Sequence, residues 1–224
     1  MKFYYFMFAM IAYLAILYVC EFVAENQVYH MINEKSLFDR GHNLLPIVPQ
    51  LYTNVVLFSL IGYFIVRIGY QQNITILTNY LWMVTLLFMG RTILLIVTQL
   101  PPSLPECSTV KKGDPLHFKL LDNKWKECLD LMYSGHTIHA TIIFLCILYM
   151  SPYTIEKVII GLLTLLEYIF IIASRMHYTA DVVVAIIVST LTFLAWADIG
   201  EIKRVWYYGG KYGNFLKENK EHVF

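Results

Sequence analysis

Charge is scarce in this sequence of 224 residues: only 15% of them are charged, and the formal net charge is +1. Nucleic-acid-binding proteins usually carry a concentrated basic face, so this composition argues against that class. The sequence also has no zinc-type spacing of cysteine and histidine, no glycine-rich phosphate loop and no internal repeat. Its four cysteines are too few and too scattered for a disulfide scaffold.

Long apolar runs are what the sequence does have. Hydrophobic residues make up 58% of the chain, which is more than a soluble domain of this length needs and is typical of membrane proteins. Six runs approach the roughly 17–25 residues that cross a bilayer, at residues 3–23, 51–68, 76–99, 137–150, 155–174 and 179–197. Continuous runs of this length indicate helices, because helices satisfy their own backbone hydrogen bonds. We therefore predict an all-α membrane protein, a bundle of six transmembrane helices that forms one catalytic domain, with a C-terminal tail at residues 198–224.

The connections between these runs differ in length. Residues 21–50 and 100–134 are long and contain prolines, whereas the others are short. With six spans, both termini lie on one face of the membrane and both long connections on the other. Lysine and arginine are divided almost evenly between the faces, so the positive-inside rule favours cytosolic termini only through the basic tail. If the long connections are lumenal, we expect Cys107 and Cys128 to form a disulfide there.

Two polar clusters enter predicted spans on the face of the long connections. The first is Ser134–Thr137, which contains His136, and the second is His177–Asp181. Polar groups at membrane depth are costly, so each cluster is a functional candidate. His177 and Asp181 are four residues apart and can touch on one face of a helix. The aspartate can then orient the imidazole for nucleophilic attack, and His136 can serve as general acid and base.

Structural interpretations compete with this one. A single histidine at a membrane boundary is more often an interfacial residue, and a His-x-x-x-Asp pair can be a hydrogen bond that closes a bundle. A metal site made from the two histidines and the aspartate would need a further carboxylate at ligand spacing, and the sequence has none there. The two clusters share one face and each opens a helix, which favours catalysis without a metal or cofactor.

At these residues the sequence resembles the sphingomyelin synthase family, within the lipid phosphatase (PAP2-like) superfamily. The family's segment before its first catalytic histidine has the form Cys-x-Asp-x-x-x-Ser-Gly-His-Thr, which is present from Cys128 to Thr137. The block His-Tyr-Thr-x-Asp-Val is complete from His177 to Val182. Further similarities are Arg91-Thr92, Val97-Thr98-Gln99-Leu100-Pro101 and Cys107 around the end of the third run, and the proline-rich Pro46-Ile47-Val48-Pro49.

The chain also departs from the family pattern. It lacks the N-terminal extension of some animal members, and the family's Pro-Leu-Pro-Asp appears only as residues 46–49, with no aspartate after them. Arg175 stands two residues before His177, whereas phosphatases of the superfamily place their arginine farther upstream. A phosphate-binding role for Arg175 therefore does not follow from the resemblance.

The resemblance implies a PAP2-like enzyme that moves a phospho-head-group from a glycerophospholipid to ceramide and releases diacylglycerol. Phosphocholine is the first candidate for that head group. His177, oriented by Asp181, would form a phosphohistidine, while His136 would protonate the departing oxygen and later deprotonate the ceramide hydroxyl. Its partners would be these lipids and the surrounding membrane, with no nucleic acid. The site would face the lumen or exterior, at the Golgi or plasma membrane, with cytosolic termini.

Several alternatives stay open. The head group could instead be ethanolamine or inositol phosphate. The same triad could hydrolyse lipids as a phospholipase C or a lipid phosphatase, or the chain could be a non-catalytic lipid transporter or scaffold. The sequence does not decide whether the chain forms a homo-oligomer.

Four further residues are candidates for substrate binding: Arg91, Asp130, Ser134 and Tyr178. Arg91 would face either the phosphate or, by snorkelling, the membrane interface, and the arginine that the family has there favours the phosphate. Asp130 would contact the cationic head group or support His136. Tyr178 could stack on a quaternary ammonium group. Glu167 lies inside the fifth run with no partner evident in the sequence, and no role is assigned to it.

Overall fold

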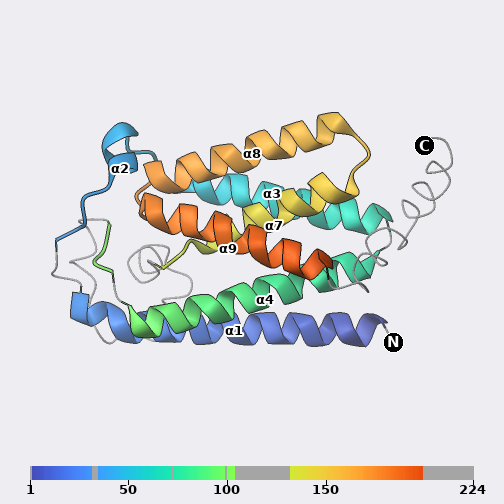
Figure 1. The fold of residues 1–224 in the computed structure, drawn as a ribbon, viewed down its shortest axis with the longest axis horizontal. Coiled ribbons are helices and arrows are strands. Elements are labelled where there is room, and N and C mark those ends of the chain that lie inside the picture. Colours follow the sequence, from blue (N-terminus) through green and yellow to red (C-terminus); the bar gives the residue numbers. More distant parts are fainter. Residues whose placement is uncertain (1, 32–34, 72, 99, 104–131, 199–224) are drawn as a thin grey trace.

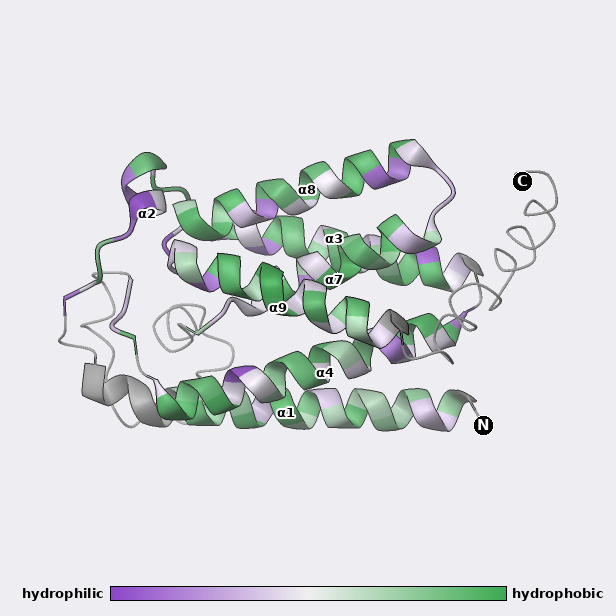
Figure 2. Ribbon diagram, viewed as in Figure 1, coloured by the Kyte–Doolittle hydropathy of each residue, from purple (hydrophilic) through white to green (hydrophobic). Residues whose placement is uncertain are grey.

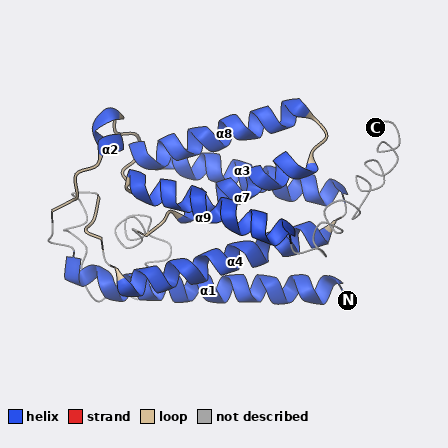
Figure 3. Ribbon diagram, viewed as in Figure 1, coloured by secondary structure: helices blue, strands red, loops and turns tan. Residues whose placement is uncertain are grey.

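The computed structural model describes residues 2–31, 35–71, 73–98, 100–103 and 132–198 of the chain. Within these ranges the regular structure is helical, without a strand (Figure 3). The helices are α1 (Lys2–Met31), α2 (Arg40–Leu44), α3 (Leu51–Gln71), α4 (Ile74–Val97), α7 (Gly135–Met150), α8 (Thr154–Ala173) and α9 (Thr179–Asp198). Each of the six long helices of the described ranges overlaps one of the six predicted runs, and α1 continues beyond its run to Met31. The predicted tail beyond residue 198 lies outside the described residues.

The long helices lie side by side, and α7 is at the centre of the bundle (Figure 1). It packs against α3, α4, α8 and α9, and its side chains are buried around most of its circumference, including Ile138, Ile142 and Ile147. On one side of the bundle, α1 lies along α4. The helix that begins next to His136 is therefore enclosed by the others.

His139, about one turn below His136, joins α1 and α4 to the central helix. Its Nδ1 lies 2.6 Å from the hydroxyl of Tyr80 on α4, and its Nε2 lies 3.0 Å from the hydroxyl of Tyr13 on α1. A polar group among apolar helices is stabilised when it is hydrogen-bonded, and here both ring nitrogens have tyrosine partners. His139 thus contacts other helices of the bundle, whereas an interfacial histidine would face the membrane surface.

The outer surfaces of the helices are apolar (Figure 2). Large side chains such as Phe8, Leu162 and Leu191 are 61%, 62% and 60% exposed, which is unfavourable in water and expected where lipid surrounds the bundle. Among the described helices, α1, α3, α4 and α9 are long and apolar enough to cross a membrane. This is the architecture of an integral membrane protein.

The two other long helices, α7 and α8, are not among the helices that are long and apolar enough to cross a membrane. The number of six spans therefore stays a prediction. The 16 residues of α7 extend about 24 Å, less than the roughly 30 Å of a hydrocarbon core. The 20 residues of α8 include Glu156, Lys157 and Glu167. Glu156 accepts a hydrogen bond from Tyr63 at 2.7 Å and pairs with Arg67 at 2.8 Å, so its charge is balanced. Glu167 is fully buried, and among the described residues neither of its oxygens has a hydrogen-bond partner.

The bundle has two different ends. One end contains the first residues of α1, the last residues of α9 and the short connection from α7 to α8 (Figure 1). The other end contains α2, the starts of α3, α7 and α9, and the segments 98–103 and 174–178. We call this second end the loop end. Both polar clusters identified from the sequence lie there.

Candidate active site

The start of α9 carries the His177–Asp181 pair. His177 stands in the connection before α9, and Asp181 lies in its first turn. Nδ1 of His177 is 3.7 Å from Oδ2 of Asp181, and the two side chains are only 5% and 6% exposed. This is an ion-pair distance, longer than a hydrogen bond. The same Oδ2 accepts a hydrogen bond from the backbone N–H of Tyr178 at 3.1 Å, so the carboxylate is fixed beside Nδ1.

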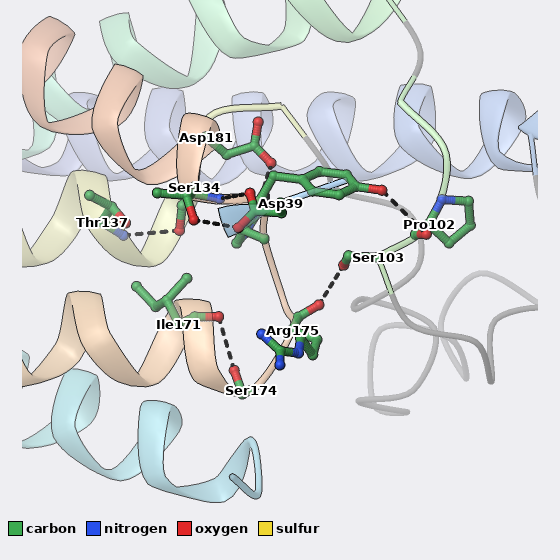
Figure 4. A network of polar contacts seen from close by, with 12 residues as sticks. Asp39, Pro102, Ser103, Ser134, Thr137, Ile171, Ser174, Arg175 and Asp181 are labelled. Carbon is green, nitrogen blue, oxygen red and sulfur yellow. Dashed lines mark hydrogen bonds and ion pairs between the residues drawn. The ribbon is translucent and has the colours of Figure 1, made fainter. Parts of the chain in front are cut away.

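The start of α7 carries the second cluster. Ser134 Oγ accepts a hydrogen bond from the N–H of Thr137 at 3.2 Å and thereby caps the helix. The N–H of Ser134 donates to the carbonyl of Asp181 at 3.4 Å, which ties the starts of α7 and α9 together (Figure 4). His136 Nε2 lies 3.1 Å from Oδ1 of Asn54 on α3. Because an amide oxygen only accepts, Nε2 carries the hydrogen of this bond.

Arg91 of α4 lies beside the first turn of α7. Its side chain is 1% exposed, and the guanidinium carbon is 5.5 Å from the ring centroid of Phe88. A Cβ on Gly135 would collide with Nη1 of Arg91, so glycine at this position allows the guanidinium to approach the helix start. The hydroxyl of Tyr133 donates to the carbonyl of Leu87. Burial raises the pKa of Tyr133 to about 12, so this hydroxyl stays a donor.

Tyr178 connects three segments at the loop end. Its buried hydroxyl donates to the carbonyl of Pro101 and accepts from the N–H of Leu37, both at 3.0 Å. Its ring stacks on His42, with centroids 5.6 Å apart and an interplanar angle of 25°. Burial raises the pKa of Tyr178, so the hydroxyl remains protonated. The residue predicted to stack on an ammonium group thus already has protein partners for its hydroxyl and one ring face.

Arg175 fixes the connection between α8 and α9. Its φ of 62° is in the left-handed region, which costs free energy for a residue other than glycine. Its Nη2 donates to the carbonyls of His42 and Leu45, the latter at 3.1 Å, and its own carbonyl accepts from Ser103 Oγ (Figure 4). These contacts hold the unusual backbone in place and join the connection to both long inter-helix segments.

Asp39, just before α2, contacts the start of α9. It accepts a hydrogen bond from the N–H of His42 at 2.9 Å, and its two oxygens accept from the N–H and hydroxyl of Thr179 at 2.7 and 2.6 Å. Burial alone would raise the pKa of Asp39, but the hydrogen bonds from Thr179 and His42 outweigh it and hold the pKa below its usual value. His42 Nε2 donates to the carbonyl of His177 at 3.0 Å.

The loop end gathers most of the residues predicted for the site: Arg91, Ser134, His136, His177, Tyr178 and Asp181. Outside the described residues lie Asp130, Cys107 and Cys128. Three residues not selected from the sequence join the site: Asn54, Asp39 and His42. Asn54 is a lone amide in an apolar run, which is a signal for function. Asp39 and His42 make contacts across 140 and 135 residues, which no local pattern reveals.

Comparison with known proteins identifies the part of the chain that contains α7, α8 and α9. Residues 127–198 match the family model described as PAP2 superfamily C-terminal. The chain carries a PAP2 superfamily C-terminal domain. This PAP2 domain includes His136, His177 and Asp181, so the resemblance expected from their motifs is confirmed at the level of the superfamily.

Proteins similar to this chain include named ceramide phosphotransferases. A phosphatidylethanolamine:ceramide ethanolaminephosphotransferase of Trypanosoma brucei brucei is 31% identical over 138 residues, covering 54% of this chain and 39% of that protein. A phosphatidylinositol:ceramide inositolphosphotransferase of Trypanosoma cruzi (strain CL Brener) is 40% identical over 70 residues, covering 30% of this chain and 21% of that protein. A protein of the same name from Leishmania major is 38% identical over 70 residues. The chain thus spans less than half the length of each of these relatives.

Proposed function

We propose that the chain is a ceramide phosphotransferase, which moves a phospho-head-group from a glycerophospholipid to ceramide. The main support is the contact between the start of α9, with the His177–Asp181 pair, and the start of α7, with His136. These elements belong to a PAP2 domain, and proteins similar to this chain are named for that reaction. A site at one end of an apolar bundle also suits two substrates that reside in a bilayer.

In the first step, Nε2 of His177 attacks the phosphodiester phosphorus of the donor. Asp181, 3.7 Å from Nδ1, orients the ring, and such catalytic contacts often tighten only when substrate binds. The bond from phosphorus to the diacylglycerol oxygen breaks, and His136 gives that oxygen a proton. The products are diacylglycerol and a phosphohistidine that carries the head group.

In the second step, the primary hydroxyl of ceramide attacks the phosphohistidine. His136, now neutral, accepts the hydroxyl proton, the bond from phosphorus to His177 breaks, and the phosphoceramide leaves. His136 is then protonated again. Since Asn54 Oδ1 accepts from Nε2 of His136, we assign the exchanged proton to Nδ1. The amide oxygen stabilises the ring in its charged form.

The names of the relatives reduce the number of candidate head groups. They support phosphoethanolamine or phosphoinositol, whereas the sequence resemblance put phosphocholine first. Purified full chain is therefore supplied with labelled ceramide and, in turn, phosphatidylcholine, phosphatidylethanolamine or phosphatidylinositol. One donor should give labelled phosphoceramide and an equal amount of diacylglycerol, identified by mass. No labelled phosphoceramide from any of the three would refute the proposal.

Hydrolysis is the main competing function, because water can attack the phosphohistidine in place of ceramide. Water is present at tens of molar, but a well-oriented acceptor reaches effective molarities of about 10⁵ M or more. The contacts of Tyr178 with Pro101 and Leu37 hold two proline-containing segments over the loop end, which supports exclusion of water. If the free phosphorylated head group exceeds phosphoceramide at every ceramide content, a lipid hydrolase replaces the transferase. Loss of turnover in folded His177→Ala would exclude a transporter or scaffold in which the histidines are only structural.

We also propose that six helices span the membrane, with cytosolic termini and the loop end facing the lumen or exterior, in the Golgi or plasma membrane. The gathering of α2, the segment 98–103 and the starts of α7 and α9 at one end supports a single exposed catalytic face. A tag with a glycosylation sequon, added after Phe224, should stay unmodified in cells. Glycosylation of that tag would show that the orientation is the reverse of the one proposed.

A further inference from the structure

The start of α9 has no cap of its own. A helix start is usually capped by Ser, Thr, Asp or Asn, whose short side chain accepts hydrogen bonds from the first backbone N–H groups. The residue before Thr179 is Tyr178, whose hydroxyl instead contacts Pro101 and Leu37. Asp39 supplies the acceptor from 140 residues away, since its Oδ2 accepts from the N–H of Thr179 at 2.7 Å. Its Oδ1 accepts from the hydroxyl of the same threonine at 2.6 Å.

Thr179 lies between His177 and Asp181 in the sequence. A contact that fixes the position of Thr179 therefore also restricts the positions of these two residues. Asp181 completes the helix start from inside, because its Oδ2 accepts from the N–H of Tyr178 and lies 3.7 Å from Nδ1 of His177. The first turn of α9 is thus held at two points, by Asp39 from outside and by Asp181 from within (Figure 4). A rotation of this turn would change the distance between Asp181 and His177.

Asp39 is itself held by α2. Its Oδ1 accepts from the N–H of His42 at 2.9 Å, and His42 Nε2 donates to the carbonyl of His177 at 3.0 Å. The close approach requires Gly41, since a Cβ there would collide with Thr179 Oγ1. Burial would raise the pKa of Asp39, but its hydrogen bonds keep that pKa below its usual value. The carboxylate is therefore ionised at neutral pH, and its hydrogen bonds are the stronger, charge-assisted kind.

We propose that Asp39 is a positioning residue that acts through Thr179 to hold Asp181 and His177 in the geometry for attack on phosphorus. This rests on the proposed function. A misplacement of about 1 Å at a reacting centre can cost roughly a hundredfold in rate. Asp39→Asn leaves one acceptor oxygen and should lower kcat by about ten- to a hundredfold. The KM values for both lipids should change by less than about twofold, because the lost effect belongs to the transition state.

The experiment measures kcat and KM for Asp39→Asn, Thr179→Val and the double variant of the purified full chain. Thr179→Val removes the hydroxyl but keeps the N–H, so its loss should be the smaller one. The double variant should lose little more than Asp39→Asn, because both changes break the same contact. Thr179→Ser, which keeps both donors, should recover most of the rate. Asn43→Asp, at an exposed position of α2, is the matched control and should leave kcat unchanged.

A second measurement does not depend on turnover. The side chain of His177 is 5% exposed, so diethyl pyrocarbonate should modify it slowly in the wild-type chain. Release of the first turn of α9 in Asp39→Asn should raise this rate several-fold, as measured by mass spectrometry of the peptide that contains His177. Thermal unfolding, recorded in parallel, gives the folded fraction of each variant.

Wild-type kcat in folded Asp39→Asn overturns the proposal. So does a loss of kcat that the folded fraction accounts for, with unchanged modification of His177. If Asp39→Asn does not fold, Thr179→Val replaces it, and unchanged kcat and modification in that variant have the same meaning. If the wild-type chain transfers no head group from any donor, the proposed function fails, while the modification rates still decide whether Asp39 positions His177.

Discussion

Replacement of Asn54 is a direct test of the acid–base role proposed for His136. Asn54 projects from α3, and its Oδ1 lies 3.1 Å from Nε2 of His136. Asn54→Leu keeps a side chain of similar size and removes the acceptor. In the proposed mechanism His136 is positively charged when it protonates the diacylglycerol oxygen. The bond that is lost is therefore a hydrogen bond to a charged group.

The expected magnitude follows from that charge. A hydrogen bond to a charged group contributes about 1.5–3 kcal/mol, and about 1.4 kcal/mol corresponds to a tenfold change in rate. Asn54→Leu should therefore lower kcat by about ten- to a hundredfold. The KM for the donor should change little, because Asn54 contacts the histidine. Asn54→Asp keeps an acceptor and should retain more activity than Asn54→Leu.

The assay is the initial rate of transfer to labelled ceramide by purified chain in vesicles of fixed donor content, corrected for the folded fraction. Asn79→Leu is a matched control, because it makes the same exchange at an amide that is 9% exposed, near the start of α4 and away from the loop end. Its kcat should stay near the wild-type value. A wild-type kcat in Asn54→Leu, or equal losses in the two leucine variants, would refute the role of Asn54.

Asp181→Asn removes the charge beside His177 and should lower turnover by at least about a hundredfold without unfolding the bundle; near wild-type turnover would remove the aspartate from the mechanism. Vanadate, whose five-coordinate adduct on His177 resembles the transition state, should inhibit, and strong chelators should not; activity lost to a chelator and restored by a divalent metal would contradict this. Because the folded state lowers the pKa of Asp39, its stabilisation is present above the ordinary value of 3.8 and is lost as pH falls through the lower folded value. The difference in Tm between wild type and Asp39→Asn should therefore be constant from about pH 7 to 5 and shrink below about pH 4; a difference that grows with acid would show the opposite sign. Glu167→Leu should not lower Tm, since neither oxygen of this buried carboxyl has a hydrogen-bond partner among the described residues, and a lower Tm would point to a partner in the rest of the chain.

The long helices were predictable because a membrane helix satisfies its backbone locally and shows this as an apolar run. For the five runs after the first, the helix bounds lie within three residues of the predicted limits. The first predicted helix ends at residue 23, where the apolar run ends. In the structure, α1 continues to Met31 through Glu25 and Asn26. Apolarity marks where a helix meets lipid, whereas the helix itself needs only its own hydrogen bonds and continues into polar sequence.

The two polar clusters were predictable for a related reason, since a polar group at membrane depth and a spacing of four residues are both local signals. The contact of Asp39 with Thr179 was not, because it depends on how two connections fold over each other. One local sign of it exists. The N-terminal residue of α9 is preceded by Tyr178, which is not a capping residue type, so the first N–H groups of this helix are open to an acceptor from elsewhere in the chain.

The two helix starts at the loop end differ in charge. A helix N-terminus generally attracts anions, but that of α9 already has the carboxylates of Asp39 and Asp181 beside it. The start of α7 is capped by the neutral Ser134, and the guanidinium of Arg91 lies against Gly135 there. A phosphodiester brought between the two starts is therefore stabilised on the side of α7 and repelled on the side of α9.

This division matches the chemistry that each histidine is proposed to perform. Positive charge develops on His177 as its nitrogen binds phosphorus, and the nearby carboxylate of Asp181 stabilises it. In the proposed mechanism, negative charge develops on the phosphate and on the departing oxygen. Arg91 and protonated His136, on the side of α7, are proposed to stabilise it. If both histidines lay at the start of α7, the nucleophile His177 would be beside the guanidinium of Arg91. If both lay at the start of α9, the acid His136 would be beside the carboxylates there. The use of two helix starts, joined by the Ser134–Asp181 backbone contact, avoids both conflicts and supports the predicted role of Arg91 in binding the phosphate.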